Sequence, residues 1–130
     1  FGADGDDFIA WRTREGYTME YALRHTLEHT DTAHIVWVQD DVLFPENVDW
    51  DRAIRGNATC LRTGTQYCGA TAYVFSRDFV KGLLFSLSQY LHVLPVDWII
   101  DLVAGGHATR YGIAKHMGRR STNARVRHVD

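Results

Sequence analysis

The stretch IVWVQDDVLFP, residues 35–45, decides the fold. Its first four residues are β-branched or aromatic and predict a buried strand. The strand ends in two adjacent carboxylates, Asp40 and Asp41, and a second apolar run stops at Pro45. In open α/β sheets, ligands bind in the crevice outside the carboxyl ends of the strands, and carboxylate oxygens there suit Mg²⁺ or Mn²⁺. The alternative is a strand that ends in a solvated acidic turn.

Length and composition predict one globular domain that spans residues 1–130. The formal net charge of −2 argues against a nucleic-acid partner, which normally needs a basic face. No apolar run approaches the roughly 20 residues that a membrane span requires. The chain begins at Phe1 rather than Met, which we interpret as the mark of an excised or processed fragment. Residues 1–11 open with glycine and aspartate and are expected to form a loop or linker.

Apolar residues at helical spacing predict a first helix over about residues 17–30, with Gly16 before it and Thr18 as a possible cap. Residues 25–29 match the H-x-x-E-H pattern of zinc proteases. The two histidines of this pattern lie one turn apart and could share a metal ion. Because both lie on the polar flank of the helix, we favour a solvated flank over a zinc site.

Local signals predict the elements that follow residue 45. Asparagine, aspartate and serine cap helices, proline fits the first turn and glycine ends a helix. These elements are a short helix over 47–54 capped by Asn47 or Asp49, a hairpin with its tip at Gly64, a strand over 69–75, a helix capped by Ser76, a helix that begins near Pro95 and ends at Gly105 and Gly106, and a last strand over 110–114.

Cys60 and Cys68 flank the tip of the expected hairpin and could face each other across it. A disulfide would imply an oxidising compartment, and two buried free thiols are the alternative. Gly69 and Ala70 open the next strand, where small residues let a ligand approach the backbone or serve only for tight packing against a helix.

Two further segments carry candidate chemistry. Asp97 falls in the first turn of a helix, where the dipole favours an anion; the functional interpretation is a general base at the lip of a cleft. His116 could bind a metal ion, and Arg119 or Arg120 could neutralise phosphate charge. The segment 116–123 is too polar for the core, so it predicts a grip on a diphosphate, with a basic surface tail as the alternative.

Taken in order, these segments resemble the glycosyltransferases of the GT-A fold. The ordered set is a strand into Gln39-Asp40-Asp41, then Cys68-Gly69-Ala70, a Ser-capped helix, Pro95-Val96-Asp97-Trp98 and His116-x-Gly118-x-x-Ser121. The likeness is to the N-acetylglucosaminyltransferase IV family and the related GPI-glycan N-acetylgalactosamine transferases, and it covers roughly residues 12–123.

The resemblance implies an α/β fold with a GT-A-like (Rossmann-like) mixed sheet flanked by helices. Much of the nucleotide-binding half that normally precedes the acidic strand is expected to be absent. Two residues depart from the family pattern: Gln39 replaces a glutamate, and Thr122 replaces a second serine.

The resemblance implies metal-dependent, inverting transfer of a sugar, an N-acetylhexosamine, from a UDP-sugar donor to a glycan hydroxyl. Asp41 and His116 would hold Mn²⁺ or Mg²⁺, and Asp97 would be the general base. The residues implied at the donor and its diphosphate are Gln39, Asp40, Arg119, Arg120 and Ser121. The residues implied at the acceptor sugar are Gly69, Ala70 and Trp98, with Tyr73 as a second aromatic that could stack on a sugar or pack in the core.

The implied compartment is the Golgi or endoplasmic-reticulum lumen. A second hypothesis is a non-catalytic glycan-binding or interaction domain on a degenerate transferase scaffold. Gln39 and the short chain favour this second hypothesis.

Overall fold

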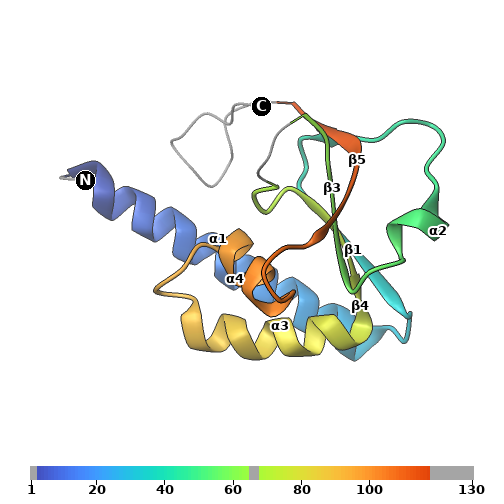
Figure 1. Cartoon of the computed structure of the whole chain (residues 1–130). Helices are drawn as coiled ribbons and strands as arrows, with labels where there is room; N and C mark the ends of the chain where they lie inside the picture. Colours follow the sequence, from blue (N-terminus) through green and yellow to red (C-terminus); the bar gives the residue numbers. More distant parts are fainter. Residues whose placement is uncertain (1–2, 65–67, 118–130) are drawn as a thin grey trace.

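A five-stranded mixed sheet lies at the centre of the structure, a computed structural model that describes residues 3–64 and 68–117 (Figure 1). Side chains are described from residue 13 onward. Helices flank the sheet, as the predicted α/β class requires. The elements are α1 (Ala3–His29), β1 (His34–Val38), β2 (Val42–Leu43), α2 (Trp50–Ala53), β3 (Ala58–Arg62), β4 (Ala72–Ser76), α3 (Arg77–Tyr90), α4 (Val96–Val103) and β5 (Thr109–His116).

The pairing directions bring three strand ends to one edge of the sheet. The strand order is β1-β4-β3-β5-β2. β4 is antiparallel to β1 and to β3, whereas β5 is parallel to β3. β1, β3 and β5 therefore run in the same direction. We call the edge where they end the carboxyl edge; it holds residues 39–41, Arg62, residues 69–71 and His116.

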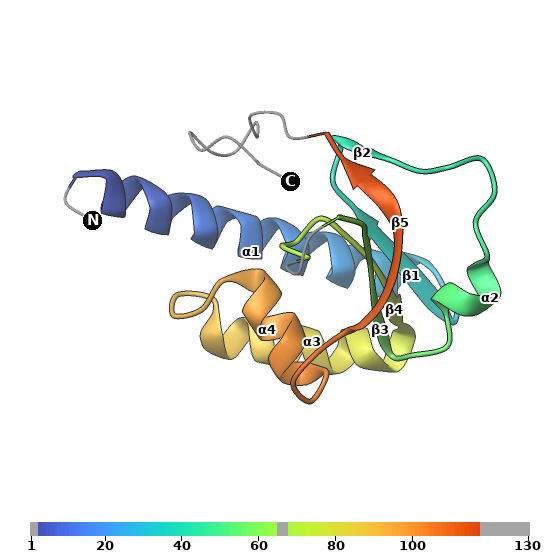
Figure 2. The ribbon, with the colours of Figure 1, turned by 45° about the horizontal axis from the view of Figure 1, so that its top comes forward.

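The sheet buries an apolar cluster on each face. Tyr73 and Phe75 of β4 join the larger cluster with side chains of α1, α3 and α4. Ala72 and Val74 alternate with them and join a smaller cluster that includes Ala53 of α2. This period of two is what a strand buried on both faces requires. Figures 1 and 2 show α1, α3 and α4 gathered on one side of the sheet and α2 on the other.

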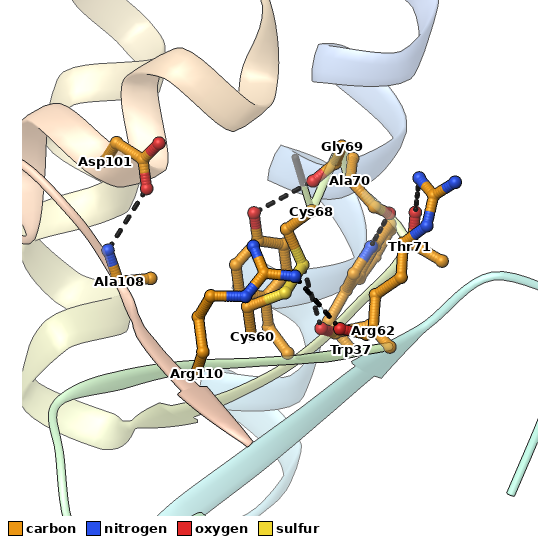
Figure 3. Close-up of a disulfide and its surroundings, with 12 residues drawn as sticks. Trp37, Cys60, Arg62, Cys68, Gly69, Ala70, Thr71, Asp101, Ala108 and Arg110 are labelled. Carbon is orange, nitrogen blue, oxygen red and sulfur yellow. Dashed lines mark hydrogen bonds between the residues drawn. A yellow bond between two sulfur atoms is a disulfide. The ribbon is translucent and has the colours of Figure 1, made fainter. Parts of the chain in front are cut away.

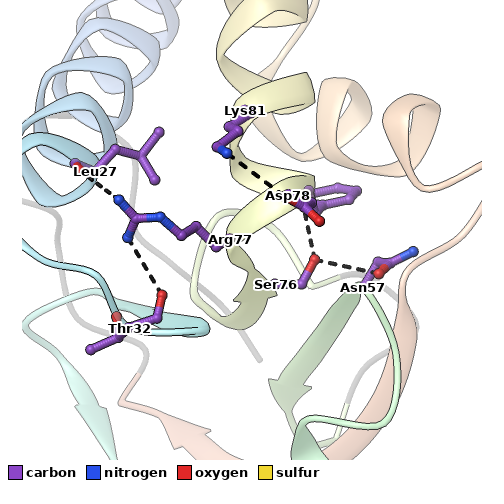
Figure 4. A network of polar contacts seen from close by, with 8 residues as sticks. Leu27, Thr32, Asn57, Ser76, Arg77, Asp78 and Lys81 are labelled. Atoms are coloured by element: carbon purple, nitrogen blue, oxygen red, sulfur yellow. Dashed lines mark hydrogen bonds and ion pairs between the residues drawn. The ribbon is translucent and has the colours of Figure 1, made fainter.

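Arg77 joins the end of α1 to the start of α3 (Figure 4). Its guanidinium donates hydrogen bonds to the carbonyl oxygens of Leu27 (2.7 Å) and Thr32 (3.4 Å). Carbonyls in the last turn of a helix lack a partner within the helix, and Arg77 supplies one for Leu27. The Ser76 hydroxyl accepts a hydrogen bond from the Phe79 N–H at 3.1 Å, which confirms the predicted cap of α3.

The other local signals also predict helix ends correctly. The Asp49 carboxylate accepts a hydrogen bond from the Arg52 N–H at 3.1 Å and caps α2. α4 starts directly after Pro95. Gly105 and Gly106 follow its end with φ values of 85° and 130°, a region that glycine enters without steric penalty.

The prediction of a loop over residues 1–11 is wrong for residues 3–11. These residues belong to α1, which spans Ala3–His29 and runs through Gly16 instead of starting after it. A glycine inside a helix costs only about 1 kcal/mol relative to alanine, which is too little to end a helix that packs on other elements.

Gly16 has a packing role in α1. A Cβ atom at this position would overlap the side chain of Leu91 and lie 3.5 Å from a methyl carbon of Val96. The backbone of α1 therefore lies directly against the segment that leads into α4. Only glycine allows an approach this close.

The region from the hairpin to β4 departs from the prediction in one detail. Gly64 has φ +87°, as a turn position requires, and residues 65–67 lie outside the described residues. The predicted strand over 69–75 begins only at Ala72. Gly69 has φ +61°, which is incompatible with an extended strand, and it lies in a turn.

The last strand is longer than the predicted range of 110–114, because β5 spans Thr109–His116. The expectation that His116 is too polar for the core is wrong, since only 2% of it is exposed. A polar side chain can be buried where it finds a polar partner, and Asp41 is that partner, as described below.

Cys60 and Cys68 form a disulfide, with their Cα atoms 6.1 Å apart. This outcome decides between the two possibilities that the sequence leaves open. The bond ties the connection between β3 and β4 to the buried strand β3, because Cys60 is only 1% exposed. Residues 69–71 of the carboxyl edge follow directly after this link.

In the part of the chain that the structure describes, no helix is both long enough and apolar enough to span a membrane.

Replacing both cysteines, Cys60→Ala with Cys68→Ala, is expected to lower the free energy of unfolding by about 2–3 kcal/mol. The disulfide closes a loop with a sequence separation of 8, which restricts the unfolded chain. Urea denaturation without reductant measures the difference. Dithiothreitol should destabilise the parent chain and leave the double variant unchanged. Equal denaturation midpoints for the parent chain and the double variant without reductant would contradict a stabilising disulfide.

Candidate functional site

Asp41 and His116 lie in contact at the carboxyl edge. His116 Nε2 is 2.9 Å from Asp41 Oδ2, and the imidazole is completely buried while 14% of the Asp41 side chain is exposed. The backbone supports this arrangement, because Val42 of β2 pairs with His116 of β5 and the Met117 N–H donates to the Asp41 carbonyl oxygen at 3.0 Å. Two residues far apart in the sequence, which the resemblance implies as metal ligands, are thus neighbours.

The second carboxylate oxygen of Asp41 is compatible with a metal ion. Asp41 Oδ1 is buried, and no hydrogen-bond partner for it occurs among the described residues. A buried carboxylate oxygen without a partner is energetically unfavourable. Carboxylate and imidazole are both ligands for Mn²⁺. Asp41 and His116 thus offer a carboxylate and an imidazole as candidate ligands, and metal binding by this pair stays a prediction.

The described residues contain no cluster of three or more histidine, cysteine, aspartate or glutamate side chains that is arranged to hold a metal ion. Any further ligands at the Asp41–His116 pair would therefore come from elsewhere, as from water and a substrate diphosphate. Such shared coordination is common for Mg²⁺, which keeps several waters and uses one or two carboxylates together with phosphate oxygens.

The neighbouring strand ends hold further polar groups at the carboxyl edge (Figure 3). The Arg62 side chain is 8% exposed and donates from its terminal nitrogen to the Thr71 hydroxyl at 3.4 Å. The Gln39 N–H donates to the Thr71 carbonyl oxygen at 2.9 Å. Asp40, which follows Gln39, is exposed in a turn. The acidic stretch that opens this edge therefore holds one inward and one outward carboxylate.

The carbonyl groups of Gly69 and Ala70 are both engaged by aromatic side chains. The Tyr73 hydroxyl donates to the Gly69 carbonyl at 2.8 Å. The Trp37 indole N–H donates to the Ala70 carbonyl at 3.0 Å (Figure 3). These bonds fix the turn before β4. Contact of Gly69 and Ala70 with an acceptor stays a prediction, beside the packing role that these bonds display.

Asp97 and the Cys60–Cys68 disulfide line a pocket of about 200 Å³. Asp101 of α4 and Arg110 of β5 also line it, and Trp98 stands at its border with 60% of its surface exposed. Asp41 and His116 are not among the lining residues. The remaining lining residues are Cys60, Cys68, Tyr73, His107 and Ala108.

Polar contacts hold both walls of this pocket in place (Figure 3). Asp101 Oδ1 accepts a hydrogen bond from the Ala108 N–H at 3.2 Å, which ties α4 to the segment before β5. Arg110 donates to the Arg62 carbonyl oxygen at 3.1 Å. The pocket thus has carboxylates on the α4 wall and a guanidinium on the β5 wall.

Asp97, Glu15 and Tyr73 have raised pKa values. Burial raises the pKa of Asp97, and the negative charge of Asp101 raises it further, while two backbone N–H groups act in the opposite direction. On α1, burial and then the charge of Asp97 raise the pKa of Glu15 to about 7. Burial also raises the pKa of Tyr73 above its usual range, with Asp97 the largest charge contribution. A carboxyl group with a raised pKa suits general base chemistry near neutral pH.

The two aromatic candidates have different environments. Tyr73 is 1% exposed and packs in the core, whereas Trp98 presents most of its indole to solvent beside Asp97. Of the two, Trp98 is the one that can stack on a sugar. Arg119, Arg120 and Ser121 lie outside the described residues.

The histidines of the H-x-x-E-H segment lie on the exposed flank of α1, as expected. The rings of His25 and His29 stack with centroids 4.0 Å apart. His29 Nδ1 lies 2.8 Å from the His25 carbonyl oxygen. No third potential ligand accompanies them within the described ranges.

Sequence reasoning missed Glu15, Asp101 and Arg110. Asp101 follows Asp97 by four residues on one helix, a spacing that places both on the same face and could have identified it. Arg110 reaches the pocket only because β5 pairs with β3 opposite Cys60. Glu15 lies next to Gly16, in a segment that we expected to precede the first helix.

Glu15→Gln is expected to stabilise the chain at pH 8 by about 1–3 kcal/mol and to change its stability little at pH 4.5. With a folded-state pKa of about 7, Glu15 contributes stability that is fully present below its unfolded pKa and is lost as the pH rises through 7. Glutamine imitates the protonated form and removes this loss. Urea unfolding of both chains at the two pH values measures the change in stability. Glu28→Gln, at an exposed position, is the control. An equal effect of Glu15→Gln at both pH values would contradict a raised pKa of Glu15.

No protein-family model, curated protein or solved structure matches this chain. The candidate site therefore rests on the geometry of the described residues.

Proposed function

We propose that this chain carries the metal and acceptor half of a GT-A-like glycosyltransferase site, which transfers an N-acetylhexosamine from a UDP-sugar to a glycan hydroxyl with inversion. The observation that carries the proposal is the contact between Asp41 and His116 at 2.9 Å. The resemblance implies both residues as metal ligands, and they lie at one edge of the sheet although they are 75 positions apart in the sequence.

Asp41 and His116 would hold Mn²⁺ or Mg²⁺. The metal ion would neutralise the charge that develops on the diphosphate leaving group. Arg62 lies at the same edge and contributes a buried positive charge. Such a fixed charge favours an anionic ligand and stabilises negative charge as it develops. We assign Gln39, Asp40, Arg119, Arg120 and Ser121 to the donor side of the site on the resemblance.

Asp97 would accept the proton from the attacking hydroxyl of the acceptor. Two features support this role: its raised pKa and its position in a pocket next to the exposed indole of Trp98. An exposed aromatic ring beside carboxylates offers an apolar surface for a sugar ring and acceptors for its hydroxyl groups. Transfer with inversion needs such a base on the acceptor side.

Two further features fit this proposal. β1 is an edge strand of the described sheet, and Val36 and Val38 on it are 47% and 39% exposed. A larger sheet, as in the GT-A fold, could pair with this edge. The disulfide between Cys60 and Cys68 fits an oxidising compartment such as the Golgi or endoplasmic-reticulum lumen.

The second candidate function is glycan binding without catalysis. The observation in its favour is that the pocket with Asp97 and Trp98 does not include Asp41 or His116. A sugar could bind to this pocket without any metal ion or donor. The two functions differ in whether a metal ion and a nucleotide bind together at the carboxyl edge.

Calorimetric titration with UDP tests the proposal. We expect Mn²⁺ to strengthen UDP binding at least about tenfold, and Asp41→Asn to remove this enhancement, because the carboxylate is lost while the shape of the side chain is kept. Asp31→Asn, at an exposed position outside the helices and strands, is the control and should retain it.

UDP binding that is indifferent to Mn²⁺ in the parent chain, and equal in the Asp41→Asn variant, would contradict the transferase proposal. In that case, binding of an N-acetylhexosamine oligosaccharide without metal that is lost in Trp98→Ala would support the glycan-binding function.

A further inference from the structure

Two histidines form a stacked pair on the exposed flank of α1. His25 and His29 are four residues apart, a spacing that places side chains above one another on a helix. Their ring centroids are 4.0 Å apart, with 23° between the ring planes. Tyr21, one turn earlier, stacks on His25 with 6.2 Å between the centroids. All three residues are exposed and belong to neither apolar cluster, so core packing does not account for the stack.

The hydrogen bond of the His29 ring defines which of its nitrogens is a potential ligand. His29 Nδ1 lies 2.8 Å from the carbonyl oxygen of His25. A carbonyl oxygen only accepts hydrogen bonds, so Nδ1 donates, and in the neutral imidazole Nε2 then carries the lone pair. Histidines that bind metal ions commonly have this arrangement, in which one ring nitrogen donates to a backbone carbonyl and the other binds the metal.

The last turn of α1 holds the histidine pair on a well-supported backbone. The Thr30 N–H and the Thr30 hydroxyl both donate to the Thr26 carbonyl oxygen, at 3.0 Å and 2.7 Å. From the start of α3, Arg77 donates to the Leu27 carbonyl oxygen at 2.7 Å. Ligands on a supported helix keep their geometry better than ligands on a loop. The two rings are therefore held near each other before any ion binds.

We propose that His25 and His29 form a binding site for a divalent transition-metal ion, of the class of Zn²⁺, Ni²⁺ and Cu²⁺, which bridges the last two turns of α1. Imidazole nitrogens suit these ions. Tetrahedral zinc, with bonds of about 2.0–2.1 Å, holds two ligand nitrogens about 3.3 Å apart. The ring centroids are 4.0 Å apart, so small rotations of the two side chains bring their nitrogens to this separation.

This site differs from a zinc-protease centre and from the site proposed at the carboxyl edge. A zinc-protease centre has three protein ligands, and residues 3–64 and 68–117 contain no group of three candidate side chains arranged to hold a metal ion. With two protein ligands at exposed positions, water fills the remaining coordination positions. The site therefore binds an ion and bridges two helical turns, and it is independent of the function proposed above.

Titration of the full chain with zinc chloride, followed by NMR of the histidine rings, tests the site. The ring signals identify each histidine separately, so zinc bound elsewhere does not obscure the result. We expect the signals of His25 and His29 to shift together at the lowest zinc concentrations, with Nε2 as the binding nitrogen of His29. His25→Ala and His29→Ala should each raise the zinc concentration that shifts the remaining ring at least about tenfold, because each variant removes one zinc–nitrogen bond.

The double variant Arg24→His with His25→Ala is the matched control. It keeps two histidines in this part of α1 but sets them five residues apart, where they lie on different faces of the helix. Its His29 signal should respond to zinc as weakly as in His25→Ala alone. Signals of His25 and His29 that do not move with zinc would overturn the proposal. Equal zinc concentrations for the shift of His29 in the parent chain and in the double variant would overturn it as well.

Discussion

The parallel pairing of β5 with β3 is the interaction on which the rest of the structure depends. It sets Cys60 opposite Arg110 and Arg62 opposite Ala114, with an irregularity between these two positions. Because β5 then continues to His116, the end of the last described strand reaches the acidic turn after β1. The pairing also completes the pocket lined by Asp97 and Asp101 of α4, because Arg110 of β5 lines its other wall. One strand pair thus joins both parts of the candidate site to the sheet.

The polar groups at the carboxyl edge are buried at some expense of stability. A buried charge is unfavourable unless a partner of opposite sign or a hydrogen-bond donor compensates it. His116 compensates one oxygen of Asp41, while the other oxygen has no hydrogen-bond partner in the described residues. An apolar pair would fill the same space more favourably. Stability alone therefore gives no reason for a carboxylate and an imidazole at this position, and the proposed metal site would give one.

Local chemistry made several elements predictable from the sequence. Ser76 and Asp49 cap helices through bonds to residues three positions away, and Gly105 ends α4 through its own conformational freedom. The strand before Asp40 followed from its β-branched and aromatic residues, but the prediction that it is buried was wrong. β1 is an edge strand of the described sheet, and only Ile35 of its five residues is buried. Features that depend on distant contacts were missed: the burial of His116 needs Asp41, and the length of α1 depends on packing around Gly16. The close approach of α1 to Leu91 and Val96 at Gly16 has no local signal at all, because it results from the packing of segments far apart in the sequence.

A crystal of the chain soaked with Mn²⁺ and UDP tests the central claim, that the carboxyl edge of the sheet is the metal and diphosphate site. Manganese scatters anomalously, so its position can be measured independently of any assay. We expect one strong peak at the shared edge of Asp41 and His116, with the diphosphate beside it, and no such peak in Asp41→Asn. A peak in the pocket with Asp97 and Asp101 instead, or no ordered manganese anywhere, would contradict the claim.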